Sequence, residues 1–189
     1  MNISIRGYQP TDRQLIENFR EKTFAEGNES LSVKKYDPDN LIGQTFLLFI
    51  EDDLASISVV ESSIKYTQED NTARICRYHI LNQHRHCNAG FRMLPYNVSW
   101  ATENNYKLIY WTHDVNNRAL NAMYQHKRRM PNKQEFFDDP LYKSFEMYPK
   151  LRFITGDVTQ YVYAKKLDTN FIWNPKGNMI ELDTEIERT

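Results

Sequence analysis

The feature that most constrains this chain is a strand that runs through a polar turn directly into a helix. Residues 74–81 alternate in character, with Cys76, Tyr78 and Ile80 on one side, which predicts a β-strand. Beyond the polar turn, apolar residues recur at helical spacing over 91–101. Such a junction directs unpaired N–H groups and the positive end of a helix at one point. It therefore predicts a site for an anionic group such as phosphate.

Hydrophobic periodicity predicts further elements on both sides of this junction. In chain order they are a strand at 3–5, a helix opening with a capping box at 11–14, a hairpin of strands at 46–50 and 55–59, a strand at 107–112, a helix around 119–124 and a strand at 161–167. Segments 27–43 and 129–158 are rich in turn-forming residues and predict loops, with short helical turns at 31–35 and 141–147. Strands that alternate with helices predict an α/β fold with a sheet flanked by helices.

Composition sets outer limits on the function. A chain of 189 residues with 40% hydrophobic content fits one domain. Its net charge of −1 gives no general attraction to nucleic acid or an anionic membrane, although a local nucleic-acid contact stays open. Only Cys76 and Cys87 are present, which argues against a disulfide scaffold and favours the cytoplasm. No apolar run approaches the ~18 residues of a membrane span, so a protein without a membrane segment is expected.

The turn itself carries a recognisable motif, Arg85-His86-Cys87-Asn88-Ala89-Gly90. It resembles the signature of the GNAT superfamily of acetyltransferases, which reads Arg or Gln, two residues, Gly, one residue, then Gly or Ala. Asn88 stands where the family usually has glycine. Because asparagine is among the few other residues that enter left-handed backbone conformations at modest cost, the turn can still form.

A second motif follows the strand at 107–112. The sequence from Asn116 to Ala119, followed by Tyr124, resembles the superfamily's strand-end asparagine, subsequent alanine and helical tyrosine. The step to Ala119 fits Asn116, whereas the step to Tyr124 fits Asn117, so both asparagines stay candidates.

The resemblance implies a GNAT-like acyl-CoA N-acyltransferase fold, with a mixed and partly splayed sheet, over residues 1–167. It leaves 129–158 as an excursion near the acceptor side and 168–189 as a C-terminal extension. The implied function is transfer of an acyl group, expected to be acetyl, from acetyl-CoA to an amine. Ile80 and Leu81 would bind the pantetheine arm through their main chain, and the turn would hold the pyrophosphate. The expected cofactor-binding residues are Ile80, Leu81, Arg85, His86, Cys87, Asn88, Ala89, Gly90, Phe91, Asn116 and Asn117.

Acyl transfer needs a neutral amine, a polarised thioester carbonyl and a proton for the departing thiolate. Tyr124 is the candidate acid, because a phenol can protonate a thiolate as its charge develops. His79 and His113 are the first candidate bases, with Asp114 and Glu61 as further ones. Each of these residues could equally be a core or solvated side chain.

Other functions stay open at this stage. His84, His86 and Cys87 have the chemistry of zinc ligands, as in a zinc hydrolase, but their spacing fits no standard site and no metal is expected. An inactive GNAT-like module that binds a protein or nucleic acid is the main alternative. The basic cluster 126–129 could cap a helix, bind the cofactor's 3′-phosphate or contact nucleic acid. Aromatic residues could line an acceptor pocket or belong to the core: Tyr110, Trp111, Phe136, Phe137 and Tyr142.

Overall fold

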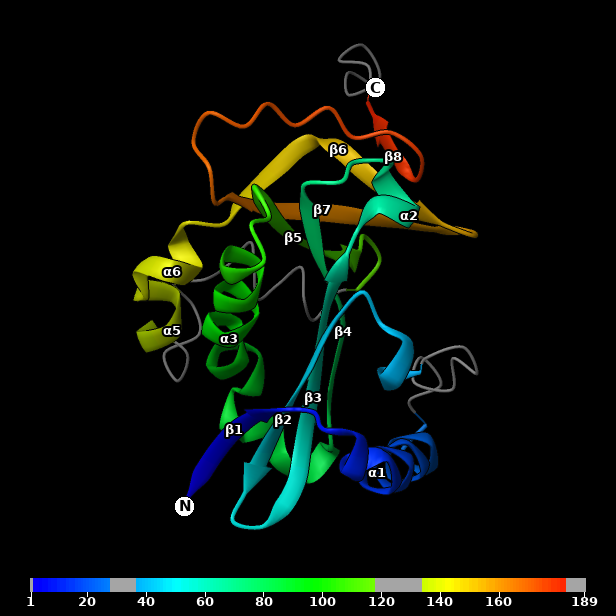
Figure 1. Ribbon diagram of the computed structural model, residues 1–189, viewed down its shortest axis with the longest axis vertical. Helices are drawn as coiled ribbons and strands as arrows, with labels where there is room; N and C mark the ends of the chain where they lie inside the picture. The colour runs from blue at the N-terminus through cyan, green and yellow to red at the C-terminus, as the bar shows by residue number, and fades with distance from the viewer. Residues whose placement is uncertain (1, 28–36, 118–133, 183–189) are drawn as a thin grey trace. The chain divides into compact units, whose positions relative to one another are not determined.

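The computed structural model describes residues 2–27, 37–117 and 134–182 (Figure 1). Contacts along the chain divide it into two compact units, residues 1–61 with 75–100 and residues 62–74 with 101–189. The strand order is β1-β2-β3-β4 in the first unit and β5-β7-β6-β8 in the second. Most of the strands are antiparallel and helices flank them, which confirms the predicted α/β class. The expected division into a domain at 1–167 and an extension stays a prediction.

The first unit contains the N-terminal strands and the predicted junction. Its elements are β1 (Ile3–Gly7), η1 (Pro10–Asp12), α1 (Arg13–Ala25), η3 (Pro38–Asn40), β2 (Gly43–Ile50), β3 (Asp53–Ser62), β4 (Thr72–Ile80), η4 (Asn82–Cys87) and α3 (Ala89–Glu103). β2 pairs antiparallel with both β1 and β3, and the β2–β3 register shifts between Leu48 and Phe49. The predicted hairpin is therefore present.

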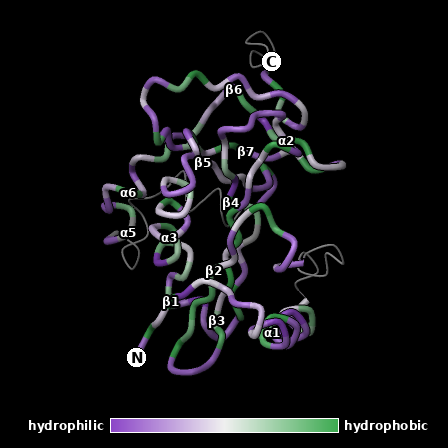
Figure 2. Tube along the Cα trace, viewed as in Figure 1, coloured by the Kyte–Doolittle hydropathy of each residue, from purple (hydrophilic) through white to green (hydrophobic). Residues whose placement is uncertain are grey.

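Both faces of this part of the sheet are covered. Leu47 packs with Phe19 of α1, whereas its neighbour Leu48 packs with Met93 of α3. Successive side chains of a strand point to opposite faces, so the continuous apolar run of β2 reflects burial on both sides. In Figure 2, α1 alternates between hydrophilic and hydrophobic residues, as expected for a helix with one buried side.

The predicted position of the capping box, 11–14, is wrong, because the box is formed by Gln9 and Asp12. The Asp12 carboxylate accepts the Gln9 N–H at 2.8 Å, the residues Pro10–Asp12 form a 3-10 turn, and α1 begins at Arg13. Arg6 of β1 binds the same carboxylate through both terminal nitrogens, at 2.6 and 2.7 Å. This hydrogen bonding lowers the pKa of Asp12 against the opposing effect of burial. A local capping box of Gln9 and Asp12, whose carboxylate also binds Arg6, thus precedes α1.

The second unit holds the C-terminal half of the chain. Its elements are α2 (Ile64–Thr67), β5 (Leu108–Asp114), α5 (Gln134–Asp138), α6 (Pro140–Lys143), β6 (Glu146–Thr155), β7 (Val158–Lys166) and β8 (Met179–Glu181). β7 pairs antiparallel with β5 and β6, and β8 pairs with β6 (Figure 1). Tyr110, Phe153 and Val162 lie at the centre of its core and are fully buried.

A buried arginine joins several strands of this unit. Arg74 is 8% exposed, and its guanidinium lies 4.1 Å from the Phe153 ring centre and 4.9 Å from that of Tyr66. It donates to the Thr112 hydroxyl at 2.9 Å, and Thr112 in turn donates to Gln160 at 2.5 Å. The aromatic rings and the hydroxyl chain stabilise the buried cation.

The prediction of a loop over 129–158 is wrong for its second half, where β6 lies. The helical turn expected at 141–147 is shorter than predicted. Asp139 caps its first residues, and α6 ends at Lys143. Buried and exposed side chains do not alternate along β6, because most of them are exposed or half-buried. Its register against β7 also shifts between Met147 and Arg152. Pairing with β7 and β8, rather than a local pattern, makes this segment a strand.

Some sequence predictions fall outside the described residues. These are the helix that carries Tyr124, the helical turn at 31–35 and the basic cluster at 126–129. Among the helices of the described ranges, none combines the length and the hydropathy needed to cross a membrane.

Candidate active site

The candidate phosphate turn lies between β4 and α3. Leu81 is extended, Asn82–Cys87 form a 3-10 helix, and Asn88 has φ 53° and ψ 40° before α3 begins at Ala89. Asn88 thus adopts the left-handed conformation that asparagine enters at modest cost. Its carbonyl accepts the N–H groups of Phe91 at 3.1 Å and Arg92 at 3.2 Å, and so caps the first turn of α3.

Two side chains of the turn, those of Cys87 and Ala89, are buried in the core of the first unit. Cys87 and Ala89 are buried against Leu48, Ala55 and Met93, and burial raises the pKa of the Cys87 thiol. The Arg92 Nε donates to the Cys87 carbonyl at 2.8 Å. Cys87 and Ala89 are therefore part of the core of this unit.

The other residues of the turn meet solvent to different degrees. Arg85 and His86 are exposed, whereas Asn88, Gly90 and Phe91 are half-buried. Two cationic or titratable side chains thus lie beside the helix N-terminus, where an anion is favoured electrostatically.

The main chain of Leu81 is already engaged. Its N–H donates to the Ala55 carbonyl at 3.0 Å, and its carbonyl accepts the His84 N–H at 2.9 Å. Of the two residues expected to bind a pantetheine arm, Leu81 thus has both main-chain groups hydrogen-bonded within the protein. Ile80 is half-buried and packs on the cluster that contains Met93.

Gly90 closely approaches a residue that the sequence-based prediction of the site missed. A Cβ atom added at Gly90 would lie 3.2 Å from Cζ and 3.3 Å from the hydroxyl oxygen of Tyr78. Tyr78 is 39% exposed and precedes Ile80 by two residues on β4, hence on the same face of the strand. The alternation of β4 placed Tyr78 on the same face of the strand as Ile80. Its contact with Gly90 is tertiary and has no counterpart in that alternation.

The end of α1 is tied to the turn by polar contacts. The Glu26 carboxylate accepts the Asn82 N–H at 3.0 and 3.1 Å. Asp53 contacts Lys22 and His84, each at 3.3 Å. Burial acts to raise the pKa of Asp53, but the hydrogen bonds from His84 and Lys22 lower it on balance. These contacts occupy His84, which sequence chemistry suggested as a metal ligand.

The candidate bases lie in different settings. His79 is buried in the first unit, and its carbonyl accepts the Ser56 hydroxyl at 2.5 Å. Glu61 of the same unit is also buried. In the second unit His113 is buried against two tyrosine rings, with ring centres 5.3 Å from Tyr163 and 5.5 Å from Tyr161.

The second motif follows β5 as an exposed turn. The Asp114 side chain accepts the Asn116 N–H at 2.8 Å, and its carbonyl accepts the Asn117 N–H at 3.0 Å. Both asparagine side chains are exposed, so either can meet a ligand. Asp114 here shapes the turn. Tyr124, the proposed acid, lies outside the described residues.

Most of the suggested acceptor-pocket aromatics that can be placed belong to the core. Tyr110 is fully buried, and Trp111 packs on Phe145, Tyr142 and Tyr163. Phe137 packs on Tyr142 with ring centres 5.6 Å apart. Within the described ranges, no three His, Cys, Asp or Glu side chains are placed to hold a metal ion.

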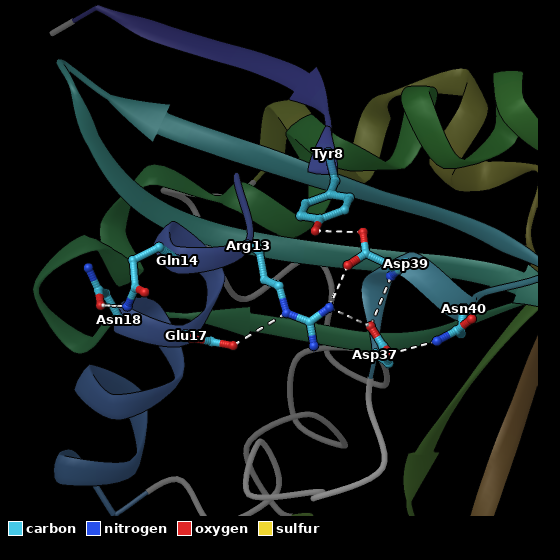
Figure 3. Close-up of polar contacts among 8 residues, drawn as sticks. All are labelled: Tyr8, Arg13, Gln14, Glu17, Asn18, Asp37, Asp39 and Asn40. Atoms are coloured by element: carbon cyan, nitrogen blue, oxygen red, sulfur yellow. Dashed lines mark hydrogen bonds and ion pairs between the residues drawn. The ribbon is translucent and has the colours of Figure 1, made fainter. Parts of the chain in front are cut away.

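A polar cluster that was not predicted fixes the segment before β2 (Figure 3). The Tyr8 hydroxyl donates to Asp39 at 2.9 Å, and Arg13 of α1 donates to the same carboxylate at 2.6 Å. Asp37 accepts the Asp39 N–H at 3.1 Å and the Asn40 side chain at 2.7 Å. Burial and the neighbouring Asp39 raise the pKa of Tyr8 to about 12. The cluster joins β1, α1 and η3.

Comparison with known proteins identifies the fold. No protein-family profile matches the sequence, and no curated protein matches it by sequence alone. Solved structures do match, and the chain has the fold of the GNAT N-acetyltransferases, as the turn motif implied.

Three of these structures illustrate the likeness. A probable acetyltransferase from Staphylococcus epidermidis has a TM-score of 0.58 at 13% identity, over 88% of this chain and 99% of its own. The PaiA N-acetyltransferase from Thermoplasma acidophilum, solved in complex with coenzyme A, has a TM-score of 0.56 at 18% identity, over 88% and 99%. The ribosomal-protein-S18-alanine N-acetyltransferase from Escherichia coli has a TM-score of 0.53 at 12% identity, over 91% and 100%. Likeness at such low identity establishes the fold rather than the reaction.

Proposed function

We propose that this protein is an acyl-CoA dependent N-acyltransferase that transfers an acetyl group to an amine. The observation that carries the proposal is the left-handed Asn88 between β4 and α3, because it preserves the motif's backbone geometry without the usual glycine. The turn occurs within a GNAT fold, and structures of that fold include one with bound coenzyme A. The two cysteines of the chain are free thiols, which fits a reducing compartment, and the proposed location is the cytoplasm.

In this proposal the cofactor's pyrophosphate lies at the N-terminus of α3. Main-chain N–H groups of the turn donate to it, the exposed Arg85 adds positive charge, and the exposed His86 is a further candidate contact. The main chain of Ile80 binds the pantetheine arm, while Asn116 and Asn117 are further candidate contacts. Coenzyme A supplies the activated acyl group, and the protein orients it.

Proton transfer is assigned to three side chains. Tyr124 is the proposed acid for the departing thiolate, and His79 and His113 are the proposed bases for the amine. Both histidines are buried. No described feature selects a class of amine acceptor.

The first experiment is calorimetric titration of the protein with acetyl-CoA, combined with thermal unfolding. A ligand that binds only the folded state stabilises it by about 2.7 kcal/mol at a hundred times its Kd, so the melting temperature should rise. Arg85→Gln should weaken binding, whereas the matched control Arg20→Gln on α1 should not. No binding at millimolar acetyl-CoA would exclude the proposal. Binding without turnover on any amine would favour the inactive-module alternative.

A further inference from the structure

The 3-10 helix that opens the turn has no cap of its own. Leu81 occupies its N-cap position and makes no side-chain hydrogen bond there, because an aliphatic side chain has no acceptor. The N–H groups at the start of a helix find no partner within that helix. The first of them, the Asn82 N–H, therefore needs an acceptor from solvent or from another element.

Glu26 supplies this acceptor from the end of α1. It directly follows Ala25, the last residue of that helix, and both of its carboxylate oxygens accept the Asn82 N–H, Oε2 at 3.0 Å and Oε1 at 3.1 Å. The contact is exposed and spans 56 residues of sequence. Glu26 and Asn82 both belong to the first unit, so the hydrogen bond lies within one compact part of the chain.

The charge of Glu26 and its hydrogen bond should act on the turn in opposite directions. In the proposed function the turn holds a pyrophosphate, and a carboxylate beside the turn repels that anion. A hydrogen bond that keeps the chain in its binding conformation improves the apparent affinity, because the observed Kd is the intrinsic Kd divided by the fraction of molecules in that conformation. Glutamine separates the two effects, since it keeps an acceptor oxygen and carries no charge.

We propose that Glu26 is a positioning residue for the cofactor, a role that rests on the proposed function. Its hydrogen bond, rather than its charge, holds the first half of the turn in the conformation that binds pyrophosphate. Asn82 begins the same 3-10 helix that ends at Cys87, directly before the left-handed Asn88. The far end of this helix is held separately, because the Arg92 Nε donates to the Cys87 carbonyl at 2.8 Å. The turn is thus fixed at both ends by side chains of other elements.

The test compares Glu26→Gln with Glu26→Ala, which carry the same charge and differ in the hydrogen bond. Calorimetry at one fixed ionic strength measures the Kd of acetyl-CoA. Glu26→Gln should bind as tightly as wild type or more tightly. Glu26→Ala should bind about fivefold more weakly than Glu26→Gln, the effect that loss of a helix cap typically has on a conformational equilibrium. Amide hydrogen exchange over residues 82–88 should also be faster in Glu26→Ala than in Glu26→Gln.

Asp37→Ala is the matched control. Asp37 also caps a 3-10 helix of the first unit, η3, and its carboxylate accepts the Asp39 N–H at 3.1 Å. The substitution removes the same charge and the same kind of main-chain hydrogen bond. It should leave the Kd of acetyl-CoA within about twofold of the wild-type value.

The results distinguish the role of Glu26 from the function on which it rests. If wild type binds acetyl-CoA and the two Glu26 variants have equal Kd values, the positioning role is overturned and the acyltransferase proposal stands. If Asp37→Ala weakens binding as much as Glu26→Ala does, the effect is not specific to the turn and the positioning role is again overturned. If wild type does not bind acetyl-CoA, both proposals fail together.

Discussion

At the scale of single residues, Asn88 decides whether the turn between β4 and α3 can form. Its φ of 53° lies in a region that costs most side chains about 1–2 kcal/mol. Glycine and asparagine enter that region most readily, so asparagine can stand where the motif that the turn resembles has glycine.

Substitutions at Asn88 should therefore separate backbone strain from side-chain chemistry. Asn88→Gly should leave the free energy of unfolding within a few tenths of a kcal/mol and keep coenzyme A affinity, whereas Asn88→Val should cost about 1–2 kcal/mol and weaken binding. Urea unfolding and calorimetry measure the two effects. Equal stability and affinity for Asn88→Val would mean that the left-handed conformation is not required.

Tyr8 offers a second test at this scale, because its raised pKa links stability to pH. The pKa is about 12 in the folded protein against 10.0 for the ordinary side chain. A group whose pKa is raised on folding contributes stability that is complete below the unfolded pKa and is lost as pH rises through the folded one. The hydroxyl's contribution should thus be present at pH 8 and fall over about pH 10 to 12.

The measurement compares the free energy of unfolding of wild type and Tyr8→Phe across this range. The wild-type advantage should shrink as the pH rises, because a phenolate next to Asp39 cannot donate a hydrogen bond. A difference that stays constant up to pH 12 would show that the hydrogen bond seen in Figure 3 does not contribute.

At the scale of elements, the short strand β8 shows how a glycine permits close packing. Gly177 has φ 63°, and a Cβ atom there would overlap the main-chain oxygen of Tyr66. The N–H of Asn178 donates to that same oxygen at 2.8 Å, which draws the two segments together just before β8 begins.

Two glycine variants distinguish backbone strain from this contact. Gly156 also has positive φ, 56°, but no atom of the described residues lies within 4 Å of its ideal Cβ position. Gly156→Ala should cost about 1–2 kcal/mol from backbone strain alone. Gly177→Ala should cost more than its control, since the Tyr66 main chain must also move. Denaturant unfolding measures both, and equal losses would contradict the close approach.

At the scale of the whole molecule, the proposed reaction includes a residue outside the described ranges, Tyr124. Tyr124→Phe keeps the ring and removes the hydroxyl, so folding and acetyl-CoA affinity should stay close to wild type. If the hydroxyl protonates the departing thiolate, turnover should fall by about 10²-fold or more with little change in substrate binding. Steady-state kinetics with the best acceptor measures this. Unchanged turnover would remove Tyr124 from the mechanism.

Contacts between separate elements, and small displacements of local ones, limited what could be predicted at this scale. The capping box lies at Gln9 and Asp12 and not at 11–14, and Arg6 of β1 binds its carboxylate. β6 was missed because its pairing with β7 contains an irregularity between Met147 and Arg152. Tyr78 was placed correctly on its strand, but nothing in the spacing indicates that its ring lies beside Gly90.

The sequence by itself determined the junction of β4, the turn and α3, including the left-handed Asn88, because periodicity and turn preferences act over a few neighbouring residues. The tertiary structure alone decided which side chains surround that junction. At the junction Glu26 reaches the Asn82 N–H across 56 residues, and in the segment before β2 Asp39 reaches the Tyr8 hydroxyl across 31 residues. Such contacts form only when distant segments pack together, since they depend on the position of each element and not on any local pattern.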